Sequence, residues 1–76
     1  MYNDSSPISD TLERLEEAEQ LKLMGQNLEA LTILEQLLIE DPENISALEE
    51  VADNELSLEN YDRAQAAAAR ATALDD

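Results

Sequence analysis

The chain has 76 residues and carries 19 acidic side chains against 4 basic ones, a net charge of −15, with no histidine and no cysteine. One small domain is the most that this length can form, and so acidic a surface repels nucleic-acid phosphates and anionic lipid headgroups. Because the commonest general base and the commonest thiol nucleophile are both missing, we expect no enzyme and no bound cofactor.

Alanine, leucine and glutamate dominate the composition, whereas there are one glycine, two prolines and two aromatic residues. That mixture favours helix nearly everywhere and predicts an all-α fold. No apolar run approaches the roughly 20 residues that span a bilayer. Residues 1–10 also lack the basic start and apolar stretch of a signal peptide. We therefore expect a cytoplasmic protein that makes no membrane contact.

From the sequence we expect residues 1–10 to be a flexible polar lead-in and residues 11–44 to form a first helical hairpin. Asp10 can cap the first helix, with Glu13 reaching back to it in a capping box. Gly25 ends this helix, since glycine adopts the left-handed conformation of a helix terminus at little cost. The apolar residues of the helix recur at helical spacing: Leu15, Ala18, Leu21 and Met24.

The second helix of this hairpin is expected over residues 28–40, with Asn27 as its N-cap. Pro42 ends it, because a proline disfavours helical backbone at the residue before it. Five residues form its apolar stripe: Ala30, Leu31, Leu34, Leu37 and Leu38.

Residues 45–76 predict a second hairpin of the same layout. Asn44 can cap a helix over residues 45–58, and Glu59 and Asn60 form the turn to a last, alanine-rich helix over residues 61–74. The apolar side of the third helix comprises Leu48, Val51, Ala52 and Leu56. Links this short make consecutive helices antiparallel neighbours.

The two hairpins repeat at a spacing of 34 residues. Sliding the chain over itself by this distance superimposes the two turns, and it pairs Ala18 with Ala52 and Ala30 with Ala64. Only 4 of the 32 pairs from Thr11 to Pro42 are identical, so the arrangement of helices and turns repeats whereas the residue identities mostly do not. Alanine at these positions lets the two helices of a hairpin cross closely.

This layout resembles the tetratricopeptide repeat, a helix–turn–helix unit of 34 residues. The second unit matches as Leu48-x2-Val51-Ala52-x2-Glu55, then Tyr61 beside the turn, then Ala64-x3-Ala68, with Asp76 where proline is usual. The first unit matches as Arg14-x2-Glu17-Ala18-x2-Leu21, then Gly25, Ala30-x3-Leu34 and Pro42. The departures are the charged Arg14 and Glu17 at apolar places and the small Ala68 and Ala71 in the last helix.

The resemblance implies a two-unit fragment of a right-handed α-solenoid, whose first helices line a concave groove. Such a groove is expected to bind a basic, partly apolar peptide or helix, with leucines supplying area and carboxylates supplying orientation and on-rate. The residues that the resemblance projects onto this face are Leu12, Leu15, Glu16, Glu19, Leu23, Glu49, Glu50, Asp53 and Leu56.

Other interpretations of the same residues remain open at this point. A plain four-helix bundle or an acidic coiled coil would also suit the composition, although Gly25 and Pro42 interrupt the heptads that a coiled coil requires. The carboxylates can simply keep a small protein soluble. They can also make the chain an acidic mimic of nucleic acid that antagonises a basic protein. A calcium loop is not expected, because residues 53–62 lack the central glycine of an EF-hand.

The last helix predicts a further contact. Repeat arrays usually need about three units and a polar capping helix, whereas here the alanine-rich stretch from Ala64 to Ala73 closes the second unit. Small side chains allow another helix to approach closely. We therefore expect a homodimer through this helix, a longer repeat array, or folding that is completed by the partner.

Overall fold

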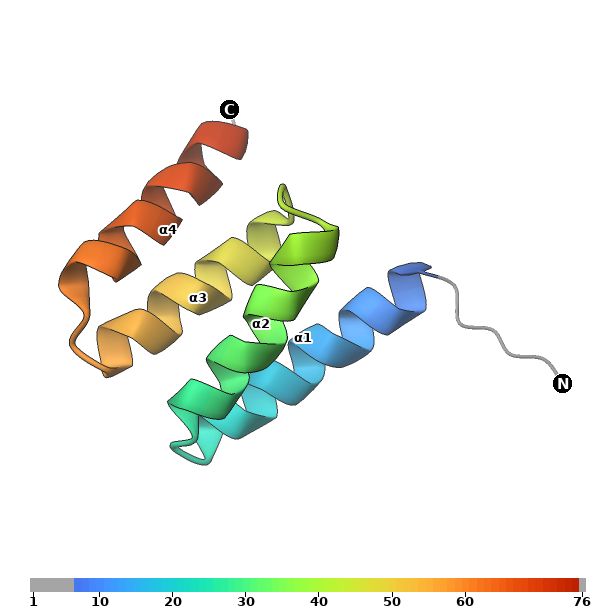
Figure 1. Ribbon diagram of the computed structural model, residues 1–76, viewed down its shortest axis with the longest axis horizontal. Helices are drawn as coiled ribbons and strands as arrows, with labels where there is room; N and C mark the ends of the chain where they lie inside the picture. Colours follow the sequence, from blue (N-terminus) through green and yellow to red (C-terminus); the bar gives the residue numbers. More distant parts are fainter. Residues whose placement is uncertain (1–6, 76) are drawn as a thin grey trace, which may run out of the picture.

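The computed structural model describes residues 7–75, and over that range it contains four α-helices and no strand. They are α1 (Pro7–Leu23), α2 (Asn27–Glu40), α3 (Ile45–Ser57) and α4 (Tyr61–Leu74). Figure 1 shows them as two successive hairpins joined by a short link. The predicted all-α class is confirmed, and the bounds of the last three helices agree with the predicted ones to within one residue.

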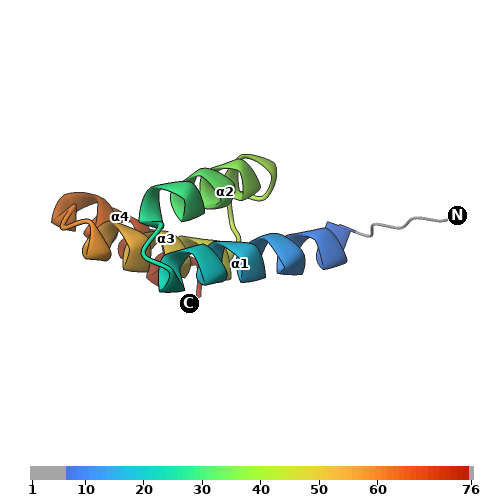
Figure 2. The same cartoon turned by 90° about the horizontal axis from the view of Figure 1, so that it is seen from below.

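α3 is the central helix of the arrangement. It contacts α1, α2 and α4, whereas α4 contacts α3 and no other described helix. Seen from below, α2 lies above the layer that contains α1 and α3 (Figure 2). The molecule measures 45 × 32 × 15 Å along its principal axes, so it is too thin for a third layer and every helix keeps a solvent-facing side.

α1 begins at Pro7, three residues before the predicted N-cap Asp10, so part of the expected lead-in is helical. A proline has no N–H and a fixed φ, and both properties suit the first position of a helix. Asp10 lies in the first turn and forms an ion pair of 2.8 Å with Arg14. Residues 1–6 of the predicted lead-in lie outside the described residues.

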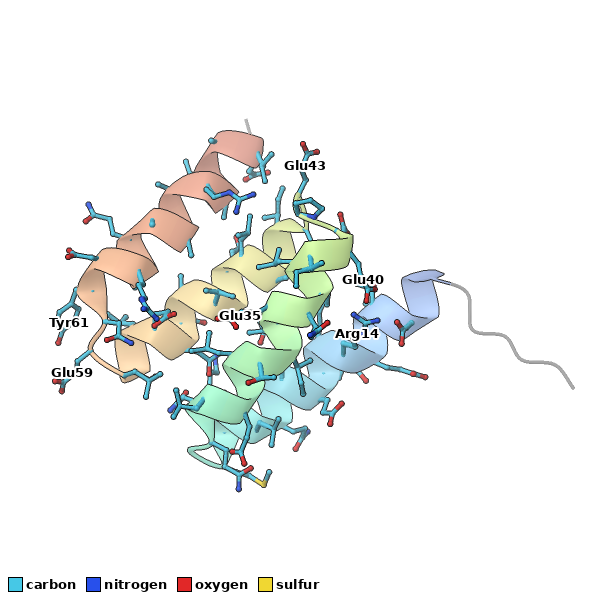
Figure 3. The ribbon with its side chains drawn as sticks, viewed as in Figure 1. Arg14, Glu35, Glu40, Glu43, Glu59 and Tyr61 are labelled. Carbon is cyan, nitrogen blue, oxygen red and sulfur yellow. The ribbon has the colours of Figure 1, made fainter. Side chains whose placement is uncertain are left out.

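Arg14, at a place where the repeat pattern is usually apolar, joins the two helices of the first hairpin. Its Nη2 donates a 2.9 Å hydrogen bond to Oε1 of Glu40, and the two side chains point toward each other in Figure 3. This charged hydrogen bond to Glu40 raises the pKa of Arg14 above its usual value. An ion pair between α1 and the end of α2 thus stands where packed apolar side chains would otherwise hold them.

The two hairpin turns have the same backbone geometry. Gly25 adopts a left-handed φ of 81°, and the N–H of Gln26 donates to the carbonyl of Leu21 at 2.8 Å. Thirty-four residues later, Glu59 has φ 66°, and Asn60 N–H donates to the carbonyl of Glu55 at 2.8 Å. Both are Schellman turns, which close a helix with a left-handed residue. The repeat is therefore present in the hydrogen bonds as well as in the layout.

The two asparagines predicted as N-caps behave differently. Asn44 Oδ1 accepts a 2.9 Å hydrogen bond from the N–H of Ala47 and caps α3 as expected. The prediction for Asn27 is wrong, because Gln26 is the N-cap of α2 and makes no capping bond with its side chain. The Gln26 carbonyl already accepts from Ala30 N–H, so Asn27 is the first helical residue.

The core lies where α3 packs against the first hairpin. Five residues form its buried cluster: Ala18, Ala30, Leu34, Leu37 and Ala47. Two residues expected on the apolar sides of their helices are instead exposed, Met24 by 61% and Leu56 by 55%, and Tyr61, expected beside the second turn, is exposed by 61%. All three lie at or beside a hairpin turn, where no neighbouring helix reaches over them. Conversely, Ala47, Asn54 and Glu55 are buried without having been expected in the core.

The left-handed glutamate in the second turn gives a stability prediction. Replacing Glu59 with glycine removes the clash of Cβ with the backbone, a cost of roughly 1–2 kcal/mol, although the freer unfolded chain takes back part of it. We expect Glu59→Gly to raise the free energy of unfolding by about 0.5–1 kcal/mol, or about 2–8 °C in Tm. The control is Glu59→Gln, which removes the same charge but keeps Cβ; equal stability of the two variants would contradict the prediction.

Candidate functional site

The outer face of α1 and α3 carries an exposed set of carboxylates and leucines. On α1 a spacing of three and four residues places four side chains in one row: Leu12, Glu16, Glu19 and Leu23. On α3 the same spacing aligns three: Glu49, Asp53 and Leu56. All seven are exposed, and we call them the acidic face. They are seven of the nine residues that the sequence placed on the binding groove.

The other two expected residues occupy less exposed positions. Leu15 is half-buried and packs against the core cluster, so its contribution is to the hairpin rather than to the face. Glu50 is also half-buried, and its Oε1 has no hydrogen-bond partner. It lies on the side of α3 that turns toward α1.

The contact between α1 and α3 collects more negative charge than positive. Lys22 Nζ lies 3.4 Å from Oδ2 of Asp53 and forms an ion pair between the two helices. Partial burial raises the pKa of Glu50, and the nearby carboxylates of Glu19 and Asp53 raise it further, whereas Lys22 acts in the opposite direction. One lysine therefore lies among three carboxylates, those of Glu19, Glu50 and Asp53. A further positive charge bound at this place is electrostatically favourable.

Lys22 is the residue of this site that the sequence did not single out. In the 34-residue repeat, Leu56 of α3 occupies the position that corresponds to Lys22 of α1. Comparison of the two units therefore does not point to a charged residue at this position. Lys22 and Asp53 come together because α1 and α3 pack side by side.

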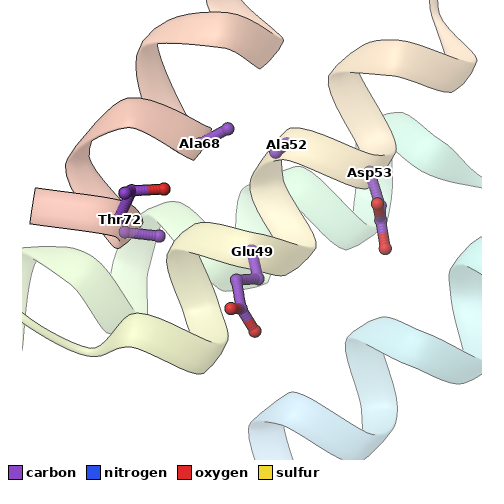
Figure 4. A pocket seen from close by; sticks show the side chains of 6 residues that line it. Glu49, Ala52, Asp53, Ala68 and Thr72 are labelled. Atoms are coloured by element: carbon purple, nitrogen blue, oxygen red, sulfur yellow. The ribbon is translucent and has the colours of Figure 1, made fainter. Parts of the chain in front are cut away.

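A concave feature lies between α3 and α4. It is a groove lined by Glu49, Ala52, Asp53, Ala68, Ala71 and Thr72. In Figure 4, Ala68 and Thr72 of α4 stand opposite Ala52, while Glu49 and Asp53 project from α3 along its rim. The acidic face and this groove therefore share two carboxylates.

Within residues 10–75, whose side chains the structure describes, no group of three or more metal-ligating residues comes together. Nor is any described helix both long enough and apolar enough to cross a membrane. The exposed carboxylates can accept hydrogen bonds from lysine or arginine side chains, and the leucines beside them offer apolar contact area.

Comparison with known proteins identifies no relative: no protein-family model, no curated protein and no solved structure matches the chain.

The raised pKa of Glu50 predicts a pH-dependent stability. Because the pKa of Glu50 is higher in the folded state than in the unfolded state, its carboxyl group does not oppose folding at low pH. The free energy of unfolding falls as the pH rises through the raised pKa. We expect Glu50→Gln to raise Tm at pH 7, where the wild-type carboxylate is charged, and to have little effect below about pH 4.

Thermal unfolding followed by circular dichroism between pH 3 and pH 8 measures this effect, since that window brackets the usual carboxyl titration. The matched control is Glu49→Gln, which removes an identical charge from the neighbouring exposed position. A gain that is the same for both variants would mean that overall charge, rather than the surroundings of Glu50, sets the difference.

Proposed function

We propose that this chain is a non-catalytic protein-interaction module whose acidic face captures a basic, partly apolar peptide or helix. The observation that carries the proposal is the pairing of exposed leucines with exposed carboxylates in matching rows on α1 and α3. Asp53 is paired with Lys22, but one cation among so many carboxylates leaves an excess of negative charge that attracts and orients a basic partner. The leucines add apolar contact area. The three leucines of the acidic face, Leu12, Leu23 and Leu56, are exposed by 55%, 71% and 55% and lie in the same rows as the carboxylates.

The same proposal assigns the two hairpins to the tetratricopeptide type. Three features support it: the Schellman turns 34 residues apart, the burial of Ala18, Ala30 and Ala64, and the packing of α3 on both helices of the first hairpin. In repeats of this type the first helix of each unit faces the ligand, and α1 and α3 are those helices here. The partner is then a protein segment rather than a small molecule.

The charge of the acidic face can be tested by reversal. Glu16 and Glu19 are exposed and neither forms an ion pair with a described residue, so Glu16→Lys with Glu19→Lys should leave the fold intact. The probe is a peptide of about 14 residues built from leucine and lysine at helical spacing. We expect the double variant to bind it roughly threefold to tenfold more weakly at low salt, as measured by isothermal titration calorimetry.

The control is Glu43→Lys with Glu59→Lys, which changes the net charge equally at two exposed residues outside the helices (Figure 3). Equal loss of affinity in both double variants would mean that the partner senses only the overall field, and the acidic face would no longer be the site.

The leucines separate peptide capture from nucleic-acid mimicry. We expect Leu12→Ser with Leu23→Ser to weaken binding of the same peptide by roughly tenfold at about 0.5 M salt, where screening leaves mainly apolar contact. A mimic would lose its binding steeply with salt and would tolerate these substitutions. An unchanged affinity at high salt would exclude the leucines from the interface, and binding that disappears with salt would favour the mimic.

A further inference from the structure

The groove between α3 and α4 has a counterpart in the first hairpin, where a helix of the molecule fills the corresponding space. It has a volume of about 390 Å³ and is open to solvent. α4 contacts only α3 among the described helices, so nothing in the described chain covers it.

The 34-residue repeat shows what fills the corresponding place in the first hairpin. Subtracting 34 from each lining residue converts Glu49, Ala52, Asp53, Ala68, Ala71 and Thr72 into Leu15, Ala18, Glu19, Leu34, Leu37 and Leu38. Of these six, Ala18, Leu34 and Leu37 belong to the buried core cluster, and Leu15 and Leu38 pack against it.

The residue that joins them in that cluster is Ala47 of α3, which is fully buried. The groove of the first hairpin is therefore occupied by a helix. The sixth residue, Glu19, remains exposed at the rim and acts on the carboxylate of Glu50, which the inserted helix carries.

The empty groove differs from the filled one in two ways. The leucines at positions 34, 37 and 38 are replaced by Ala68, Ala71 and Thr72, so the wall is shallower and the space larger. Leu15 is replaced by Glu49, so the rim now holds two carboxylates, Glu49 and Asp53. An occupant must supply large apolar side chains where α3 supplies alanine, and positive charge where α3 supplies Glu50.

We propose that the groove between α3 and α4 binds a basic amphipathic helix of a partner protein, seated relative to the second hairpin as α3 is seated relative to the first. A second copy of this chain fits the seat poorly, because two molecules that each carry a charge of −15 repel one another. The proposal deepens the proposed function and rests on it: it adds a helical conformation of the partner and a second contact region that shares Glu49 and Asp53 with the acidic face.

The probe for this seat is α3 itself, rewritten for the wider groove. It is a synthetic peptide of residues 45–58 with Ala47→Leu and with lysine in place of Glu49, Glu50, Asp53 and Glu55. The unaltered 45–58 peptide and a scrambled version of the lysine peptide are the control ligands. Because isolated helices of this length are marginal in water, circular dichroism of the mixture also reports helix formation on binding.

The protein variants are matched in charge. Ala68→Arg with Thr72→Arg fills the groove from α4, whereas Ala69→Arg with Ala73→Arg adds the same charge at exposed residues of α4 outside the groove. We expect the first pair to weaken binding of the lysine peptide by about tenfold or more and the second pair by less than about threefold. Amide chemical shifts should change at Ala52, Ala68 and Thr72 when the peptide is added to the wild-type protein.

Each outcome bears on the proposal. Equal binding by both variants, or equal binding of the scrambled peptide, overturns it. Shifts confined to Leu12, Glu16 and Leu23 also overturn it while leaving the proposed function intact, and loss of all basic-peptide binding contradicts both. Sedimentation equilibrium tests a second copy as the occupant: a dimer of the wild-type chain that Ala68→Arg with Thr72→Arg abolishes would assign the groove to a second copy and overturn the heterologous partner.

Discussion

α3 enters the first hairpin through the small side chain of Ala47, and the rest of the structure depends on this close contact. Ala47 is fully buried in one cluster with Ala18, Leu34 and Leu37, so a larger residue there would force α3 away from α1 and α2. α4 is attached to the molecule through α3 alone among the described helices. The position of the second hairpin, the alignment of the two rows of the acidic face and the opening of the groove beside α4 therefore all follow from how deeply α3 is seated.

Polar groups fasten the other end of α3, where apolar packing is scarce. Glu55 is buried; its Oε1 accepts a 2.8 Å hydrogen bond from Asn60 Nδ2, and its Oε2 lies 3.9 Å from Nη1 of Arg63. Asn54 is fully buried and donates from Nδ2 to the carbonyl of Glu50. The contacts of Glu55 tie the end of α3 to Asn60 in the second turn and to Arg63 in α4, whereas the Asn54 bond lies within α3. Between α1 and α3, by contrast, partial burial and the nearby carboxylates of Glu19 and Asp53 raise the pKa of Glu50, so its negative charge opposes folding.

Much of this architecture could be predicted from sequence, and the failures have specific physical causes. Helical periodicity, Gly25, Pro42 and the cap Asn44 located the helices because each acts locally on the backbone. Periodicity does not reveal how far a neighbouring helix extends, so Met24 and Leu56 were placed on the apolar sides of their helices although they lie past the edge of the core. The burial of Ala47 could not be foreseen either, since it depends on α3 packing against both helices of the first hairpin. For the acidic face, spacing along each helix sufficed to align the rows, whereas the Lys22–Asp53 pair required the contact between α1 and α3.

The two hairpins are alike in backbone and unlike in what fills them, and this difference links stability to binding. Where α2 presents Leu34, Leu37 and Leu38, α4 presents Ala68, Ala71 and Thr72, and each buried CH₂ that is absent forgoes about 0.8 kcal/mol. α4 therefore packs with less apolar area than α2 and has one neighbouring helix in place of two. A helix seated in the groove would give α4 a second neighbour and supply the missing apolar area. Because a ligand that binds only the folded state stabilises it, the shallow wall that weakens the second hairpin alone is also what leaves room for its partner.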